Sequence, residues 1–173
     1  MRAHPQTRPS PAMNTPRQPA DDAPDTQQIL ARATERLPAG ADGRRPYAGD
    51  VTPNEAWQLM GRPGVRFIDV RSPEEHRYVG HVPGSELVVW RGTGEEQVDQ
   101  FMKELGERAA PDEVVLLLCR SGVRSVRAAT AATARGFSRA CNILEGFEGK
   151  LDANGQRGHL DGWRKTGLPW KQD

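Results

Sequence analysis

The sequence of 173 residues contains only two cysteines, Cys119 and Cys141, and their spacing matches neither a disulfide framework nor a metal site. Aromatic residues make up 6% of the chain, and no apolar run approaches the roughly 20 residues of a transmembrane helix. The net charge of +1 provides no global field that would favour nucleic acid or a membrane surface. The N-terminus also lacks an apolar signal core. We therefore expect a cytoplasmic protein with no nucleic-acid partner and no membrane partner.

Three segments differ in composition. Residues 1–24 contain six of the 14 prolines and almost no bulky aliphatic residue, which predicts a disordered Pro-rich tail. Residues 25–46 are expected to form a helix and a linker, because Asp25 can cap a short apolar stripe that Pro38 ends. Residues 47–173 are expected to form the folded domain.

Within that domain, helical and extended patterns alternate. Helices are predicted to begin after capping boxes at residues 52–55 and 72–75, and another helix is predicted over 94–106. Short apolar strands are predicted at 65–70, 86–90, 114–118 and 140–144. This alternation predicts an α/β fold, with a doubly wound, mainly parallel sheet and helices on both faces.

The most informative stretch joins the strand at 114–118 to an Ala-rich helix. Five apolar residues in a row indicate a strand buried on both faces, and Cys119 follows at once. Gly122 lets the loop curl, so that successive N–H groups can converge. Those N–H groups, the helix dipole, Arg120 and Arg124 all favour an anion. A thiol at this place should lose its proton easily and act as a nucleophile. The alternative is a buried core cysteine, which the flanking arginines disfavour.

The loop Cys119-Arg120-Ser121-Gly122-Val123-Arg124-Ser125 resembles the active-site loop of rhodanese-like sulfurtransferases. Asp69-Val70-Arg71 and Gly80-His81-Val82-Pro83-Gly84-Ser85 resemble two further motifs of that family, in family order. Gly162-Trp163-Arg164-Lys165-Thr166-Gly167-Leu168-Pro169-Trp170 resembles its closing segment. The resemblance covers about residues 47–170 and implies the rhodanese-like α/β fold.

The resemblance also implies an activity: transfer of a sulfane sulfur from a small anionic, thiosulfate-like donor to a thiophilic acceptor. Cys119 would be the catalytic residue and would carry the sulfur as a persulfide. The acceptor would be cyanide or a thiol, including a protein thiol, and neither a metal nor an organic cofactor is needed. Residues expected to bind the substrate are Arg120, Ser121, Gly122, Val123, Arg124, Ser125 and Arg71. Asp69 is expected to support the site.

Two other functions remain open from the sequence. Loops of the related phosphatases and arsenate reductases resemble Cys-x5-Arg, whereas Arg124 follows Cys119 after four residues, which favours sulfur over phosphate. A rhodanese-like domain can also serve as a binding module or a sulfur relay, although inactive versions typically lack the cysteine.

Several single residues keep two interpretations. Asp69 either accepts hydrogen bonds from Arg124 or the loop amides, or caps a helix. Arg71 either faces the pocket and binds the donor, or pairs with Glu74 or Glu75 at the surface. Arg127 either extends the positive patch or is merely solvated.

Three further features are expected to be structural. Cys141 is expected in the core rather than as a second reactive thiol, and His81 in the scaffold. Residues 151–162 depart from the short pattern of the family and are expected to form a rim beside the active-site loop.

Overall fold

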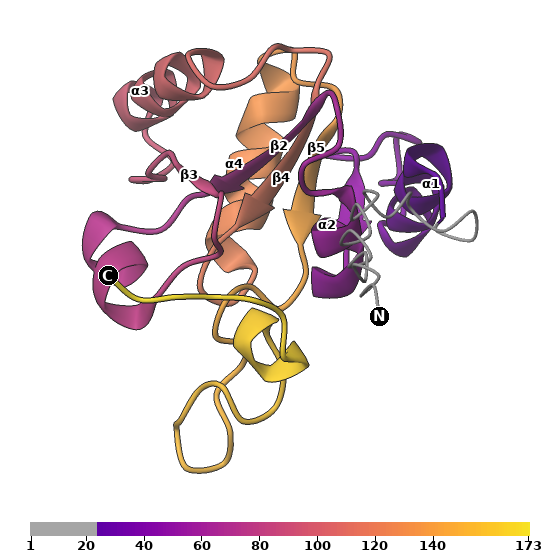
Figure 1. Cartoon of the computed structure of the whole chain (residues 1–173). Helices are drawn as coiled ribbons and strands as arrows, with labels where there is room; N and C mark the ends of the chain where they lie inside the picture. Colours follow the sequence, from indigo (N-terminus) through magenta and orange to yellow (C-terminus); the bar gives the residue numbers. More distant parts are fainter. Residues whose placement is uncertain (1–23) are drawn as a thin grey trace, which may run out of the picture.

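The computed structural model of the chain describes residues 24–173, so the predicted disorder of the tail, residues 1–24, concerns a segment outside them except for its last residue. Five parallel strands form one sheet in the order β1-β5-β4-β2-β3, with helices on both faces (Figure 1). This confirms the predicted α/β fold. In chain order the elements are α1 (Thr26–Arg36), β1 (Gly49–Val51), α2 (Pro53–Leu59), β2 (Val65–Asp69), η1 (Glu75–Val79), β3 (Glu86–Leu87), α3 (Glu95–Gly106), β4 (Val114–Leu118), α4 (Val123–Ala134), β5 (Ala140–Ile143) and η2 (Trp163–Thr166).

The central strand β4 is buried on both faces, as its run of apolar residues predicted. Its side chains alternate between two hydrophobic clusters, as the pleat of a strand requires. Val115 and Leu117 lie with Cys119 in the cluster beneath α3 and α4, whereas Leu116 and Leu118 lie in the cluster beneath α1 and α2. Cys119 therefore directly follows a strand in which every residue is buried.

Helix α1 packs into the same core as the sheet. Asp25 and Gln28 form a capping box at its start, and Ile29 and Ala33 are completely buried. At its end, the Arg36 guanidinium donates two hydrogen bonds of 2.7 and 2.8 Å to the carboxylate of Glu55 in α2. The helix predicted from residue 25 onward thus covers the sheet edge formed by β1.

Two strands differ from the prediction. The sequence did not indicate β1, because three residues are too few for a periodic pattern. Its register, Gly49 opposite Cys141 and Val51 opposite Ile143, comes from pairing with β5. The strand predicted over 86–90 is only two residues long as β3, although the amide of Val88 still donates to Asp69. The amide of Trp90 likewise donates to the Val70 carbonyl at 3.0 Å, so the chain stays alongside β2 to the end of the predicted strand.

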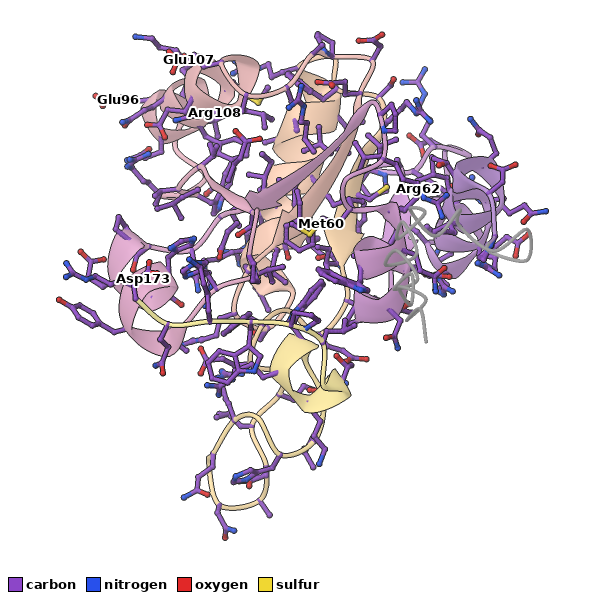
Figure 2. The ribbon with its side chains drawn as sticks, in the orientation of Figure 1. Met60, Arg62, Glu96, Glu107, Arg108 and Asp173 are labelled. Carbon is purple, nitrogen blue, oxygen red and sulfur yellow. The ribbon has the colours of Figure 1, made fainter. Side chains whose placement is uncertain are left out.

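The C-terminal segment packs against η1 and the residues that follow it. Residues 171 and 81 exchange two backbone hydrogen bonds, and Asp173 lies against η1 (Figure 2). Trp163 is fully buried and meets the ring of Phe67 edge-on at 5.3 Å. No helix within residues 24–173 has the length and apolar character needed to cross a membrane.

Candidate active site

Cys119 lies in the tight connection between β4 and α4. Gly122 caps α4 with φ at +91°, a left-handed conformation that glycine adopts without strain. This turn points the Gly122 amide at the sulfur, with 3.1 Å between N and Sγ, and the Ser125 hydroxyl lies 3.2 Å from the same Sγ. The cysteine side chain is 1% exposed. A donor therefore reaches the sulfur only when the side chains at the loop surface move aside.

The start of α4 offers further donors to an anion. Among residues 24–173, no protein acceptor takes the amide hydrogens of Val123, Arg124 or Ser125. These amides carry the positive end of the helix dipole. Arg120 is exposed and has no carboxylate within ion-pair distance in the described part of the chain. The loop thus combines one buried sulfur, oriented N–H groups and an unneutralised cation.

Arg124 has a partner that the sequence did not indicate. Its Nη1 and Nη2 donate to the two carboxylate oxygens of Glu75 at 2.7 and 2.6 Å. Glu75 also closes the predicted capping box, exchanging hydrogen bonds with Ser72. The predicted bond between Arg124 and Asp69 is therefore wrong. The bidentate pair ties the first turn of α4 to η1 and so holds one side of the loop.

Asp69 is instead paired with Arg71, and both side chains are 0% exposed. The guanidinium of Arg71 donates to both carboxylate oxygens of Asp69 and to the Gly80 carbonyl, and its Cζ lies 4.2 Å from the Phe147 ring centroid. The predictions that Arg71 faces an open pocket, or pairs with Glu74 or Glu75 at the surface, are therefore wrong. A buried carboxylate draws its guanidinium inward, because leaving either charge unpaired in the core would cost several kcal/mol, about 3–5.

The turn after β5 is hydrogen-bonded to the backbone of the loop that carries Cys119. Phe147 N donates to the Cys119 carbonyl at 2.7 Å, and Glu148 N donates to the Arg120 carbonyl at 2.9 Å. Glu145 and Gly146 are both left-handed, each with φ at +67°. A Cβ on Gly146 would lie 2.5 Å from backbone atoms of Arg120. The loop backbone therefore rests directly on a residue that has no side chain.

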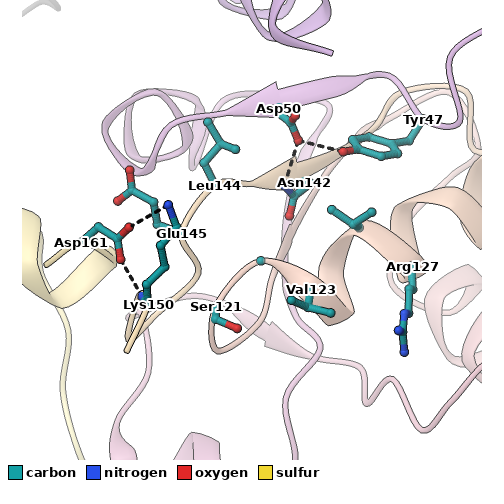
Figure 3. Close-up of a pocket in the computed structure, with 12 residues that line it drawn as sticks. Tyr47, Asp50, Ser121, Val123, Arg127, Asn142, Leu144, Glu145, Lys150 and Asp161 are labelled. Atoms are coloured by element: carbon teal, nitrogen blue, oxygen red, sulfur yellow. Dashed lines mark hydrogen bonds and ion pairs between the residues drawn. The ribbon is translucent and has the colours of Figure 1, made fainter. Parts of the chain in front are cut away.

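A cavity of about 630 Å³ opens beside the loop. Figure 3 shows Ser121, Val123 and Arg127 on one side of it and Tyr47 and Asn142 on another. Its remaining lining residues are Asp50, Gly122, Val126, Leu144, Glu145, Lys150 and Asp161. Arg127 is exposed and has no ion-pair partner among residues 24–173, so it adds a second free cation near the loop.

The insertion at 151–162 was expected to form a rim beside the loop, and its residue Asp161 lines this cavity. Lys150 N donates to the Asp161 carboxylate at 2.7 Å, and that contact closes the base of the insertion (Figure 3). Asp152 holds its tip through the amides of Asn154 and Gln156. The insertion therefore has a defined internal structure next to the loop.

The second cysteine belongs to the core, as predicted. Cys141 is 1% exposed in β5, and burial raises the pKa of its thiol to about 12. It does not supply a second thiolate at neutral pH.

One group of side chains in the described residues has the composition of a metal site. Ligand atoms of His76, His81 and Asp173 lie within 4.8 Å of one another. The two imidazole rings, however, are stacked with centroids 4.0 Å apart and planes 8° from parallel. Their in-plane lone pairs therefore do not converge on one ion. His81 is buried and bonded to backbone, which agrees with its expected role in the scaffold.

The pair formed by Glu75 and Arg124 should make stability fall in acid. Burial raises the pKa of Glu75, but hydrogen bonds from Arg124 and Ser72 outweigh it and hold that pKa below its usual value of 4.5. The stabilisation is therefore complete above about pH 4.5 and is lost as pH falls through the lower pKa of the folded state.

We expect Glu75→Gln to lower the free energy of unfolding by about 1 kcal/mol at pH 7, the size typical of a well-formed but partly exposed ion pair. Urea unfolding from pH 7 to pH 3 should show this gap closing below about pH 4.5, since a protonated Glu75 resembles glutamine. A gap that stayed constant down to pH 3 would contradict the assignment.

The comparisons with known proteins agree with this geometry. The family model described as "Rhodanese-like domain" matches residues 52–152. A crystal structure of Rv0390 from M. tuberculosis is 44% identical, covers 73% of this chain and 99% of its own, and superposes with a TM-score of 0.63. An uncharacterized protein of Rickettsia conorii is 31% identical over 118 residues, which are 65% of this chain and 88% of the relative. The thiosulfate sulfurtransferase GlpE of Actinobacillus pleuropneumoniae serotype 7 is 27% identical over 69% of this chain and 90% of its own.

Proposed function

Since this chain belongs to the rhodanese-like domain family, we propose that it is a sulfurtransferase that carries a sulfane sulfur on Cys119 as a persulfide. The observation that carries the proposal is the environment of Sγ. The Gly122 amide and the Ser125 hydroxyl both reach the sulfur, at the start of a helix whose first amides have no acceptor among residues 24–173. Such donors stabilise negative charge where it develops.

In the loading step, the Cys119 thiolate attacks the outer sulfur of an anionic donor such as thiosulfate. A new S–S bond forms, the S–S bond of thiosulfate breaks, and sulfite leaves with the bonding pair. The product is a Cys119 persulfide anion, whose outer sulfur lies within reach of the amides of residues 120–125. Arg120 attracts the donor, because it is the exposed cation of the loop. Ser121 and Val123 line the cavity beside the loop, and they would have to move for the donor to reach the buried sulfur.

In the unloading step, a thiophilic acceptor attacks the outer sulfur. Cyanide would leave as thiocyanate and a thiolate would leave as a persulfide, with Cys119 released as the thiolate in either case. The cavity beside Ser121 and Gly122 is large enough for a small thiol. Arg124 acts through its contact with Glu75, which keeps the first turn of α4 in place for both steps.

Phosphoryl chemistry is disfavoured by the same residues. Four residues separate Cys119 from Arg124, and the Arg124 guanidinium is already bound to a carboxylate rather than free for a tetrahedral oxyanion. Release of phosphate from an aryl phosphate, dependent on Cys119, would favour the phosphatase alternative.

The direct test is the intact mass of the full chain after incubation with thiosulfate and removal of the excess. We expect the mass to rise by one sulfur atom and to return to its starting value after cyanide is added. Cys141→Ala is the matched control and should gain the same sulfur, because its thiol is buried and protonated. A folded protein that gains no sulfur from thiosulfate or polysulfide would overturn the proposal in favour of a binding module.

A further inference from the structure

A continuous row of hydrogen-bonded side chains links the reactive sulfur to the cavity. The Ser125 oxygen lies 3.2 Å from Cys119 Sγ and 2.7 Å from Asn142 Oδ1. The Asn142 amide nitrogen donates to Asp50 at 2.8 Å, and the Tyr47 hydroxyl donates to the same Asp50 oxygen at 3.0 Å (Figure 3). These residues come from the loop, α4, β5, β1 and the segment before β1, so only the fold brings them together.

We propose that Asn142, oriented by Asp50, is a positioning residue that decides where the Ser125 hydroxyl donates its hydrogen and so sets how readily the Cys119 thiol ionises. The inference rests on the proposed function, because it concerns the ionisation of the same sulfur.

The orientation of Asn142 follows from what its neighbours can accept. The Asp50 carboxylate only accepts hydrogen bonds, so the NH2 group of Asn142 must face it. The carbonyl of the same amide then faces Ser125, and Asn142 is only 2% exposed. Burial, and then the charge of Asp50, raise the pKa of Tyr47, so its hydroxyl remains a donor. The amide therefore presents an acceptor to Ser125.

Ser125 has one hydroxyl hydrogen and two acceptors that compete for it. When Cys119 is a thiol, the S–H can donate to the Ser125 oxygen while the hydroxyl donates to Asn142, and every group is satisfied. When Cys119 is a thiolate, the hydroxyl turns to the sulfur, and the buried Asn142 carbonyl loses its donor. Leaving a buried acceptor unpaired is unfavourable, so Asn142 opposes the free thiolate.

The persulfide changes this balance. Its charge lies mainly on the outer sulfur, which faces the loop amides, so the inner sulfur of Cys119 becomes a weak acceptor. The Ser125 hydroxyl can then return to Asn142, and no buried group remains unpaired. The arrangement therefore disfavours the unloaded thiolate relative to the sulfur-loaded form.

Substitutions at Asn142 and Ser125 leave every charged group around the thiol in place. Arg124 is paired with Glu75, and Arg71 with Asp69. The other charged or titratable groups of the segments packed around the loop are Arg120, Arg127, Glu145, Glu148, Lys150, Asp161 and Asp50, with His76 and Arg77 in η1. Because the substitutions leave all of these in place, a change in the titration of the thiol reports on Ser125 and its partner.

The test is an ultraviolet absorbance titration of the Cys119 thiolate, with the curve of the Cys119→Ser protein subtracted. Asn142→Leu should lower the midpoint of the thiol titration by about 0.5–1 pH unit. A shift of this size corresponds to the net free energy of one hydrogen bond. Asn142→Ala, which adds no bulk, should shift the midpoint in the same direction and covers the case in which leucine prevents folding. In a Ser125→Ala background, neither substitution should move the midpoint, because Asn142 acts through Ser125.

An unchanged midpoint in both single variants would overturn the inference, and so would a shift that persists without the Ser125 hydroxyl. The titration needs no sulfur donor, so its result is independent of whether the protein transfers sulfur. A protein that gains sulfur from thiosulfate but shows no coupling would lose only this inference. A protein that shows coupling but gains no sulfur would lose only the proposed function.

Discussion

Cys119→Ser should reduce sulfur transfer from thiosulfate to cyanide to the rate of the uncatalysed reaction, a loss of at least about 10³-fold. A hydroxyl is a weak nucleophile towards sulfur and cannot form the persulfide. The substitution exchanges one small side chain for another at a position that is 1% exposed and bonded to Gly122 and Ser125, so the fold should be retained. Thiocyanate formation under steady-state conditions measures the loss.

The matched control is Cys141→Ala, which removes the other cysteine of the chain, in the neighbouring strand β5. It should keep most of the activity, because burial raises the pKa of that thiol to about 12 and keeps it protonated. Thermal unfolding of both variants separates a chemical effect from a structural one. Activity retained by a folded Cys119→Ser protein would rule out a persulfide on this residue.

Gly146→Ala should remove most of the activity without touching any reactive group, with a loss of about 10²-fold or more. The new Cβ would lie 2.5 Å from Arg120 C and Ser121 N and 2.6 Å from the Cys119 carbonyl oxygen. These are backbone atoms, so no side chain can turn aside, and the loop itself must shift. A left-handed φ of +67° also disfavours alanine, and we expect the free energy of unfolding to fall by about 2–4 kcal/mol.

Gly61→Ala is the control that separates the two effects of Gly146→Ala, the backbone strain of a left-handed alanine and the contact with the loop. Gly61 is left-handed as well, with φ at +81°, but a Cβ at this position would have no atom within 4 Å beyond its own chain neighbours. Gly61 is also distant in sequence from the loop. The variant should lose about 1–2 kcal/mol of stability from backbone strain and keep its turnover. Equal turnover in the two variants would mean that contact between Gly146 and the loop does not position Cys119.

The local sequence was sufficient to predict the central part of the site. A run of five apolar residues that ends at Cys119, with Gly122 and Arg124 after it, defines a strand, a tight loop and a helix start without knowledge of any distant residue. Capping boxes located the starts of α1 and α2 for the same reason, since each is made by residues three apart in the chain. Short-range patterns of this kind report on structure that forms from neighbouring residues.

The partners of the charged residues were harder to predict. The capping box identified Glu75 as a helix-starting residue, but its second bond, to Arg124, spans 49 positions and has no local signal. The sequence suggested Asp69 for that contact because both residues follow strands. In the structure Asp69 is taken by Arg71, two positions away, whose side chain turns into the core.

The sequence by itself thus determined the parallel α/β arrangement and the place of Cys119 between a buried strand and a helix. Only the tertiary structure decided which side chains surround the sulfur. Asp50 and Asn142 are 92 positions apart and meet because β1, a strand too short to recognise, pairs with β5. Periodicity records which residues are buried, but strand order and register determine which buried polar groups meet, and those depend on the packing of the whole chain.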